Sequence, residues 1–179
     1  MAIHKFSMLF KDLETNLGRE TALKIFPEWT TMPDKMDKIE QVNLMRQIMA
    51  RMDKTLNHEI ILKIRHGHTC NIPKTQRSEM VELMKKCKNI DEFLIAYYGC
   101  IKQEDGTYLT NFGSGATKCW CNLFYKLKEY EPISITWCEC CNGHTQKSIM
   151  EICRHPVKTE IIESVASGGK SCRYRITVL

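Results

Sequence analysis

The sequence predicts an α+β fold in which a helical first half packs on a small antiparallel sheet. Over about the first hundred residues, apolar residues recur every three or four positions, the spacing of one face of an α-helix. After Gly99 the chain changes to short β-prone runs separated by turn residues. Near the end, the turn residues 167–170 (Ser-Gly-Gly-Lys) separate two such runs, which is typical of a β-hairpin.

Six helical segments are expected in the first half. The first, 4–17, ends at Gly18, and a short second helix ends near Pro27. The third, 34–52, carries methionines that are expected to pack in the core rather than to bind a ligand. In the last segment, Asn89 and Glu92 have the spacing of a capping box. The remaining expected helices span residues 58–65, 78–86 and 89–98.

The second half is expected to form a strand, helix, strand, strand unit. Asn142 is interpreted as the cap of a helix that runs to about Arg154, where a histidine and a proline end it. In the final strand apolar and polar residues alternate, so one face is buried and the other is solvated. The expected strands span residues 108–112, 118–123, 133–137, 157–165 and 171–178. Residues 1–179 are thus expected to form one domain, with a helical part (1–100) and a cysteine-rich part (101–179).

Composition and charge narrow the class of protein. Of the 179 residues, 43% are hydrophobic and 26% are charged, which are ordinary values for a globular chain. No apolar run approaches the roughly 20 residues of a membrane span, and the N-terminus lacks the apolar stretch of a signal peptide. The net charge of +5 is spread along the chain rather than gathered in a basic block. We therefore expect a cytoplasmic protein that binds neither nucleic acid nor membrane.

Ten cysteines are the unusual feature of the composition. None lies in the first 69 residues, and six lie between Cys119 and Cys153. A secreted disulfide framework is normally shorter and follows a signal peptide. In a reducing compartment, thiols serve instead as core residues, metal ligands or reactive groups. The second half is therefore expected to hold a ligand or metal site rather than a disulfide framework.

Two Cys-x-Cys pairs form the strongest candidate metal site. Cys119 and Cys121 lie on one expected strand, and Cys138 and Cys140 on the next. Alternate residues of a strand point to one face, so four thiolates would converge if these strands pair, an arrangement that suits zinc or an iron–sulfur centre. The alternative is that several of these cysteines are small buried hydrophobic residues. The adjacent pair formed by Cys140 and Cys141 favours a site.

A second group of candidate ligands follows the helix expected at residues 58–65. The sequence His66-Gly67-His68-Thr69-Cys70 places two imidazoles and a thiol close together, and both groups bind borderline metals. We include His68 and Cys70 with the four cysteines as candidate metal ligands. The alternative is a histidine that interacts with the dipole at a helix C-terminus.

A nucleophilic thiol is a further hypothesis. His144 is expected near the start of the helix that follows the cysteines, where the helix dipole favours an anion and lowers the pKa of a nearby thiol. Cys140 or Cys141, with His144 as its base, is then a candidate nucleophile. The sequence contains no phosphate loop, dinucleotide fingerprint or serine elbow.

The stretch 156–176 resembles the closing hairpin of the 4-vinyl-reductase domain family. In that hairpin a Gly-rich turn is followed by a cysteine, a basic or polar residue, an aromatic residue and an aliphatic strand end, matched here by Cys172, Arg173, Tyr174 and Ile176. The same pattern occurs in L-2-amino-thiazoline-4-carboxylic acid hydrolases, and the chain is most similar to an uncharacterised bacterial cysteine-rich family within that group. The resemblance implies an α+β domain that binds small hydrophobic molecules, sometimes with zinc, and that often forms homodimers.

The resemblance also bears on the metal site. Regulatory members of the 4-vinyl-reductase family bind zinc through a glutamate and a cysteine in the first hairpin strand and a cysteine in the second. Cys172 matches the last of these ligands, although its alternating strand position by itself indicates a core residue. Ser164 stands in the place of the middle cysteine, so the resemblance leaves any metal to the two Cys-x-Cys pairs.

Together these features predict a binding domain for a small organic ligand. The pocket is expected between the helical half and the sheet, lined by Trp120, Trp137, Tyr174 and the methionine-rich helices, with the candidate metal ligands at its mouth. One alternative is a hydrolase of the thiazoline ring-opening type, using a cysteine nucleophile or a metal-bound water. Another is an interaction protein with a purely structural thiolate site.

Overall fold

The computed structural model describes residues 2–179 except 68, 111–118, 120 and 126. The first half contains six helices and one 3-10 turn: α1 (Ala2–Leu17), α2 (Arg19–Ile25), the turn Pro27–Thr30, α3 (Lys38–Thr55), α4 (His58–Gly67), α5 (Lys74–Lys86) and α6 (Ile90–Tyr98). The second half contains β1 (Ile101–Lys102), β2 (Tyr108–Leu109), a 3-10 turn (Ile135–Trp137), α7 (Glu139–Cys153), β3 (Val157–Glu163), a 3-10 turn (Val165–Ser167) and β4 (Arg173–Val178). The predicted α+β class is confirmed.

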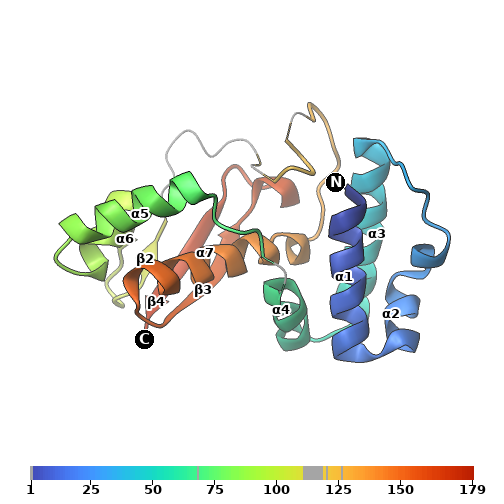
Figure 1. Ribbon diagram of the computed structural model, residues 1–179, viewed down its shortest axis with the longest axis horizontal. Coiled ribbons are helices and arrows are strands. Elements are labelled where there is room, and N and C mark those ends of the chain that lie inside the picture. The colour runs from blue at the N-terminus through green and yellow to red at the C-terminus, as the bar shows by residue number, and fades with distance from the viewer. Residues whose placement is uncertain (1, 68, 111–118, 120, 126) are drawn as a thin grey trace.

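The elements form two groups in an elongated molecule (Figure 1). Helices α1, α2 and α3 lie side by side at one end, with the N-terminus, and α5, α6, α7 and the sheet lie at the other end, with the C-terminus. Helix α4 lies between the groups and packs on both α1 and α7. Each group has its own hydrophobic core. The region where α4, α7 and the end of the hairpin meet therefore joins the two cores.

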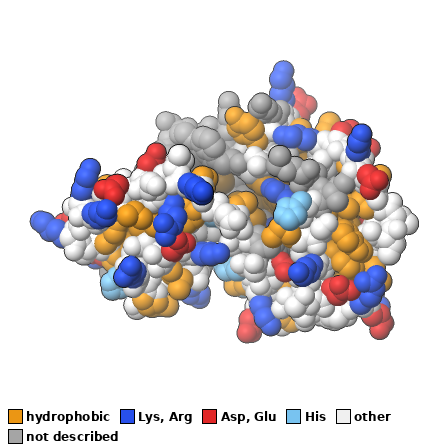
Figure 2. All heavy atoms as spheres, viewed as in Figure 1, with side chains coloured by type: hydrophobic (Ala, Val, Ile, Leu, Met, Phe, Trp, Pro, Cys, Tyr) orange, Lys and Arg blue, Asp and Glu red, His pale blue; other side chains and the backbone are white. Residues whose placement is uncertain are grey.

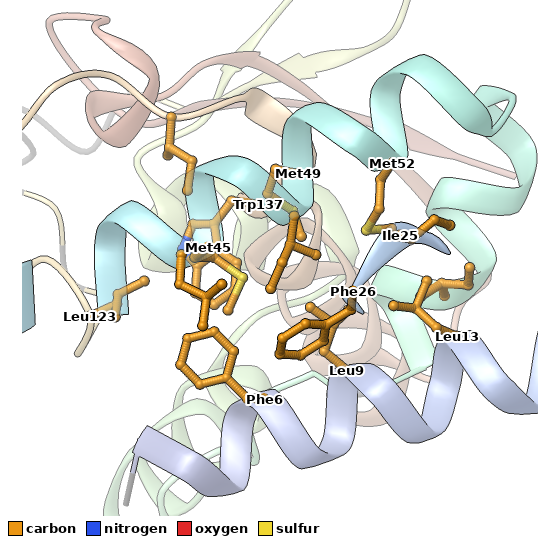
Figure 3. Packing of buried hydrophobic residues seen from close by; sticks show 14 of the residues in the cluster. Phe6, Leu9, Leu13, Ile25, Phe26, Met45, Met49, Met52, Leu123 and Trp137 are labelled. Carbon is orange, nitrogen blue, oxygen red and sulfur yellow. The ribbon is translucent and has the colours of Figure 1, made fainter. Parts of the chain in front are cut away.

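The helical core is built from regularly spaced apolar residues. In α1 the buried side chains of Phe6, Leu9 and Leu13 follow the helical repeat and point toward α2 and α3 (Figure 3). The methionines of α3 pack against them, as predicted: Met45, Met49 and Met52 are at most 1% exposed. Helix α3 begins with a capping box formed by Asp37 and Glu40.

The sheet has the strand order β1-β2-β4-β3, with every neighbouring pair antiparallel. Strands β3 and β4 form the predicted hairpin, and its connection is a 3-10 turn followed by Gly168 at a φ of 90°, which glycine adopts without strain. In β4, Tyr174 and Ile176 are buried and Arg175 is exposed, so the predicted alternation is confirmed. Helix α7 packs on β3, where Asn142 donates to the carbonyl of Thr159.

Several local predictions are wrong in the second half. The segment 133–137 is not a strand: Ile135–Trp137 forms a 3-10 turn, and the Ser134 side chain before it accepts a hydrogen bond from the Thr136 N–H. Helix α7 therefore begins at Glu139, which places Asn142 inside the helix rather than at its cap. The described part of the segment 118–123 is no strand either, since residues 121–125 form turns closed by hydrogen bonds to the carbonyl of Cys121. Residues 111 and 112 of another expected strand lie outside the described residues.

The capping prediction for α6 holds only in part. Asn89 accepts a hydrogen bond from the Glu92 N–H, as a cap should. The Glu92 carboxylate, however, accepts from the N–H of Lys88, one residue before the expected partner.

On the surface, charges of both signs are interspersed over the face shown in Figure 2. Among the described helices, none is both long enough and apolar enough to cross a membrane.

Candidate functional site

A cavity of about 480 Å³ lies where the sheet group meets the residues that precede α7. This volume is in the range of small-molecule sites in proteins. Its walls come from α5, α6, Cys119 and Cys121, the start of α7 and both ends of the hairpin connection. The lining residues are Gln76, Tyr97, Tyr98, Cys119, Cys121, Trp137, Cys138, Cys141, His144, Thr145, Ser164, Cys172 and Tyr174.

Most of the predicted site residues meet in this cavity. They are Cys119, Cys121, Trp137, Cys138, Cys141, His144 and Tyr174. Cys140 is not among the lining residues, but it interacts with the lining residue Cys141 on one side and with Cys70 on the other. Trp120 and His68 are outside the described residues. The methionines of α3 belong to the helical core and not to this lining, so that part of the pocket prediction is wrong.

Sequence analysis missed the tyrosines and Gln76, which α5 and α6 contribute. Gln76 donates a hydrogen bond to the Tyr97 hydroxyl, and the rings of Tyr97 and Tyr98 meet edge to face. Two adjacent aromatic residues at the end of a short helix were an available signal, because both cannot be buried on one helix face. Ser164 and Cys172, known only through the family resemblance, also face the cavity.

Four of the cysteines gather near the hairpin connection, and we name Cys119, Cys121, Cys138 and Cys172 the hairpin thiols. The Cys138 Sγ lies 2.8 Å from the Ser164 Oγ. Burial raises the pKa of Cys138 to about 11, although the hydrogen bonds to Ser164 and Ser167 act in the opposite direction. Burial likewise raises the pKa of Cys119 to about 12. Without a bound cation, both groups are therefore neutral thiols at neutral pH.

Three further cysteines form a chain at the start of α7, and we name Cys70, Cys140 and Cys141 the helix thiols. The Cys70 thiol bonds to Cys140, and this bond, with burial, raises the pKa of Cys70. The bond from Cys140 to Cys141 is the main reason that the pKa of Cys140 rises to about 11; the Cys70 bond and the nearby Arg65 charge oppose it. The chain thus leads from an exposed residue, Cys70, to the cavity wall at Cys141.

Tyr174 lies between the two groups of thiols. Its side chain is buried, which raises the pKa of the phenol, and the Cys141, Cys172, Cys138 and Cys140 thiols add to the rise. The phenol is therefore protonated over the physiological range and is a hydrogen-bond donor at the cavity wall.

Arg65 fixes the backbone on which the site is built. Its side chain is fully buried and donates to the carbonyls of Thr136, at 3.2 Å, and Trp137, at 2.8 Å. The guanidinium also stacks on the Trp137 ring, 4.7 Å from its centre. Arg65 therefore ties α4 to the turn that leads into α7. The sequence signal was an arginine one turn after Ile61, on the apolar face of the helix.

His144 is held through one of its ring nitrogens. Its Nδ1 lies 2.5 Å from the carbonyl oxygen of Cys70. A carbonyl only accepts hydrogen bonds, so this contact requires a proton on Nδ1, and in the neutral ring the electron pair is then on Nε2. Cys141 and His144 are three residues apart in α7 and both line the cavity. His144 lies in the second turn, not at the helix start, so the helix dipole acts mainly on Cys140 and Cys141.

The predicted convergence of four thiolates does not occur in the expected form. Cys138 precedes α7 and joins the hairpin thiols, whereas Cys140 is inside the helix and contacts Cys70. Residues two apart in a helix point away from each other, unlike residues two apart in a strand. In the part of the chain that is described, no three His, Cys, Asp or Glu side chains are arranged to hold a metal ion. The zinc or iron–sulfur site stays a prediction.

Comparison with known proteins gives one match. Residues 2–179 match the model of a family of unknown function (DUF6144). No curated protein and no solved structure matches the chain.

Proposed function

This chain belongs to a family of unknown function (DUF6144), and from its site we propose that it binds a small organic molecule in the cysteine-lined cavity. The observation that carries the proposal is the cavity itself. Its volume of about 480 Å³ suits a small ligand, and aromatic rings and thiols make up most of its walls. Such walls favour a largely apolar molecule, because burial of its surface drives the binding.

A few polar groups could orient the ligand. The Tyr174 phenol and the His144 imidazole both line the cavity, the imidazole is held through Nδ1 by the Cys70 carbonyl, and the Ser164 hydroxyl is engaged with Cys138. A small number of placed polar groups in an apolar pocket is the usual basis of ligand specificity. We therefore expect a ligand with an apolar body and one hydrogen-bonding end.

The binding proposal is tested by filling the cavity. Thr145 lies on the cavity wall, so Thr145→Phe should occupy the ligand's space, whereas Met150→Phe adds a ring to the exposed face of the same helix. Compounds from a small-molecule library that raise the melting temperature of the wild type should also stabilise Met150→Phe and should not stabilise Thr145→Phe. Equal stabilisation of both variants by every such compound would place the binding elsewhere.

A zinc ion or an iron–sulfur centre at the hairpin thiols is a second part of the proposal. Four cysteines lie in one region, and metal binding would offset the raised pKa values by stabilising thiolates. Elemental analysis and an absorption spectrum of the purified protein test this. Near-stoichiometric zinc, or iron with a sulfide charge-transfer band, is expected, and it should be lost in Cys138→Ser and retained in Cys87→Ser, a cysteine outside the cavity. Protein without metal or chromophore contradicts this part and leaves the binding proposal standing.

The orientation of His144 favours a second candidate function, hydrolysis through a Cys141 nucleophile. The bond from His144 to the Cys70 carbonyl holds the ring with Nε2 free, as a base that activates a thiol requires. One equivalent of iodoacetamide at neutral pH should modify Cys141 first, because the neighbouring imidazole would accept the thiol proton and so increase the reactive thiolate. Peptide mapping identifies the site, and His144→Gln should slow the reaction. An unchanged rate in that variant would exclude His144 as the base.

A further inference from the structure

A second cavity lies at the end of the helical core, on the other side of Trp137. It has a volume of about 440 Å³ and is lined by Lys5, Phe6, Lys38, Gln41, Met45, Asn122, Leu123 and Trp137. Figure 3 shows Phe6, Met45, Leu123 and Trp137 gathered at this end of the core. Among the lining residues of the two cavities, only Trp137 is shared. The second cavity is therefore a separate space with one apolar wall in common.

The charge of this cavity is positive and is not neutralised by its walls. Lys5 and Lys38 line it, and among the described lining residues there is no aspartate or glutamate. The Lys5 Nζ lies 3.8 Å from the Cys121 Sγ and 5.9 Å from the centre of the Trp137 ring. The Lys38 Nζ donates to the carbonyls of Asn122 and Tyr125, at 3.2 and 2.6 Å. These are neutral dipoles and a ring, and they leave both formal charges in place.

Some lysines of the described structure form ion pairs with nearby carboxylates, namely Lys24–Glu20, Lys85–Glu82, Lys88–Glu92, Lys102–Asp91 and Lys158–Glu160. Within the described residues, Lys5 and Lys38 form no such pair. Two ammonium groups on one partly apolar cavity repel each other, and a bound anion would relieve that repulsion.

We propose that this second cavity binds an amphipathic organic anion, namely a carboxylate with an apolar chain. The carboxylate would lie between Lys5 and Lys38, where both ammonium groups can donate to its oxygens. The chain would lie against Phe6, Met45 and Leu123, where it buries apolar surface. The inference does not depend on the proposed function, because it concerns a different space and different polar groups.

Calorimetric titration with decanoate and decan-1-ol tests whether a negative charge on the ligand strengthens its binding. The two probes have the same chain length and differ in the head group, so the wild type should bind decanoate about ten- to hundredfold more tightly, as expected for hydrogen bonds to a charged group. Lys5→Met should remove most of this preference. Lys11→Met makes the same change on an exposed position of the same helix and should retain it. Equal affinity for both probes, no binding of either, or an equal loss in both variants would overturn the proposal.

Variants that fill one cavity or the other then show which cavity binds decanoate. Gln41→Trp should fill the second cavity and abolish decanoate binding, whereas Thr145→Phe fills the cysteine-lined cavity and should leave that binding unchanged. The reverse pattern would move decanoate into the cysteine-lined cavity and contradict the inference while supporting the proposed function. The two proposals therefore fail separately.

Discussion

Arg65 shows how one residue can hold the site together. It is among the largest fully buried side chains, and an ionised group in the interior is costly unless hydrogen bonds and nearby dipoles replace its hydration. The carbonyls of Thr136 and Trp137 and the face of the indole do this. Because those residues lead into α7, the position of Cys138 and of the first turn of α7 depends on Arg65.

We predict that Arg65→Met destabilises the fold by about 2–4 kcal/mol, because it leaves buried carbonyls without donors. Urea denaturation followed by circular dichroism measures the change. Arg19→Met is the control, since Arg19 is exposed and its ion pair with Glu14 lies at the surface, and it should cost less than about 1 kcal/mol. Similar losses in the two variants would show that the buried hydrogen bonds contribute little.

For single residues, the sequence predicted which residue types form the site better than it predicted which of these residues lie next to one another. The dense cysteines and Trp137 were recognisable because they lie close together in the chain. The separation of Cys138 from Cys140 was not, because it depends on whether residue 140 is in a strand or a helix. Tyr97 and Arg65 enter the site through tertiary packing, which leaves only weak local signals.

Among the elements, α4 and the residues that follow it pack closely on α7, and Gly143 permits this approach. A Cβ atom at this position would lie 2.8 Å from both the His66 Cγ and the Thr69 Cγ2. Such distances are too short for carbon atoms, so only glycine allows the two segments to approach this closely. The contact keeps the residues after α4, including Cys70, beside the start of α7.

Gly143→Ala should therefore destabilise the fold by about 1–3 kcal/mol, because α4 and α7 must move apart. Gly67→Ala is a matched control in a helix, as its Cβ would meet nothing closer than the Asp12 Oδ2 at 3.8 Å. That variant should be neutral or slightly stabilising, since alanine favours the helix. Thermal melting measures both, and a neutral Gly143→Ala would mean that His66 moves aside at little cost.

Element types were predictable where the periodicity was long. The helices of the first half follow apolar stripes over two or more turns, and the hairpin has a strong turn signal. The segment 133–137 is short and rich in β-branched residues, which favours a strand locally. In the fold, the Ile133 N–H bonds to the carbonyl of Ala166 and Trp137 enters the core, so tertiary contacts override that preference.

For the molecule as a whole, buried thiols are expected to lower the free energy of unfolding as the pH becomes alkaline. Burial raises the pKa of Cys100 to about 12 and that of Cys138 to about 11, above the ordinary value of 9.0. The folded state then holds these protons more tightly than the unfolded state does. The resulting stabilisation is fully present below pH 9 and is lost as the pH rises toward 11 and 12.

We accordingly predict that the free energy of unfolding falls steadily between pH 9 and 11. Urea denaturation at pH 7, 9, 10 and 11 measures it, in buffers that contain a reductant. Cys100→Ala removes one of the titrating groups and should reduce the slope above pH 9, whereas Ile95→Ala, at an exposed position without a titratable group, should leave it unchanged. The same slope in all three proteins would show that other groups, such as lysines, control alkaline stability.

The position of Trp137 between the two cavities has a consequence for cooperativity. Only a ligand that displaced the indole would change the shape of the other space, and by thermodynamic reciprocity each ligand would then alter the affinity of the other by the same factor. Arg65 stacks on this ring and opposes such a displacement, so the two cavities should bind their ligands independently.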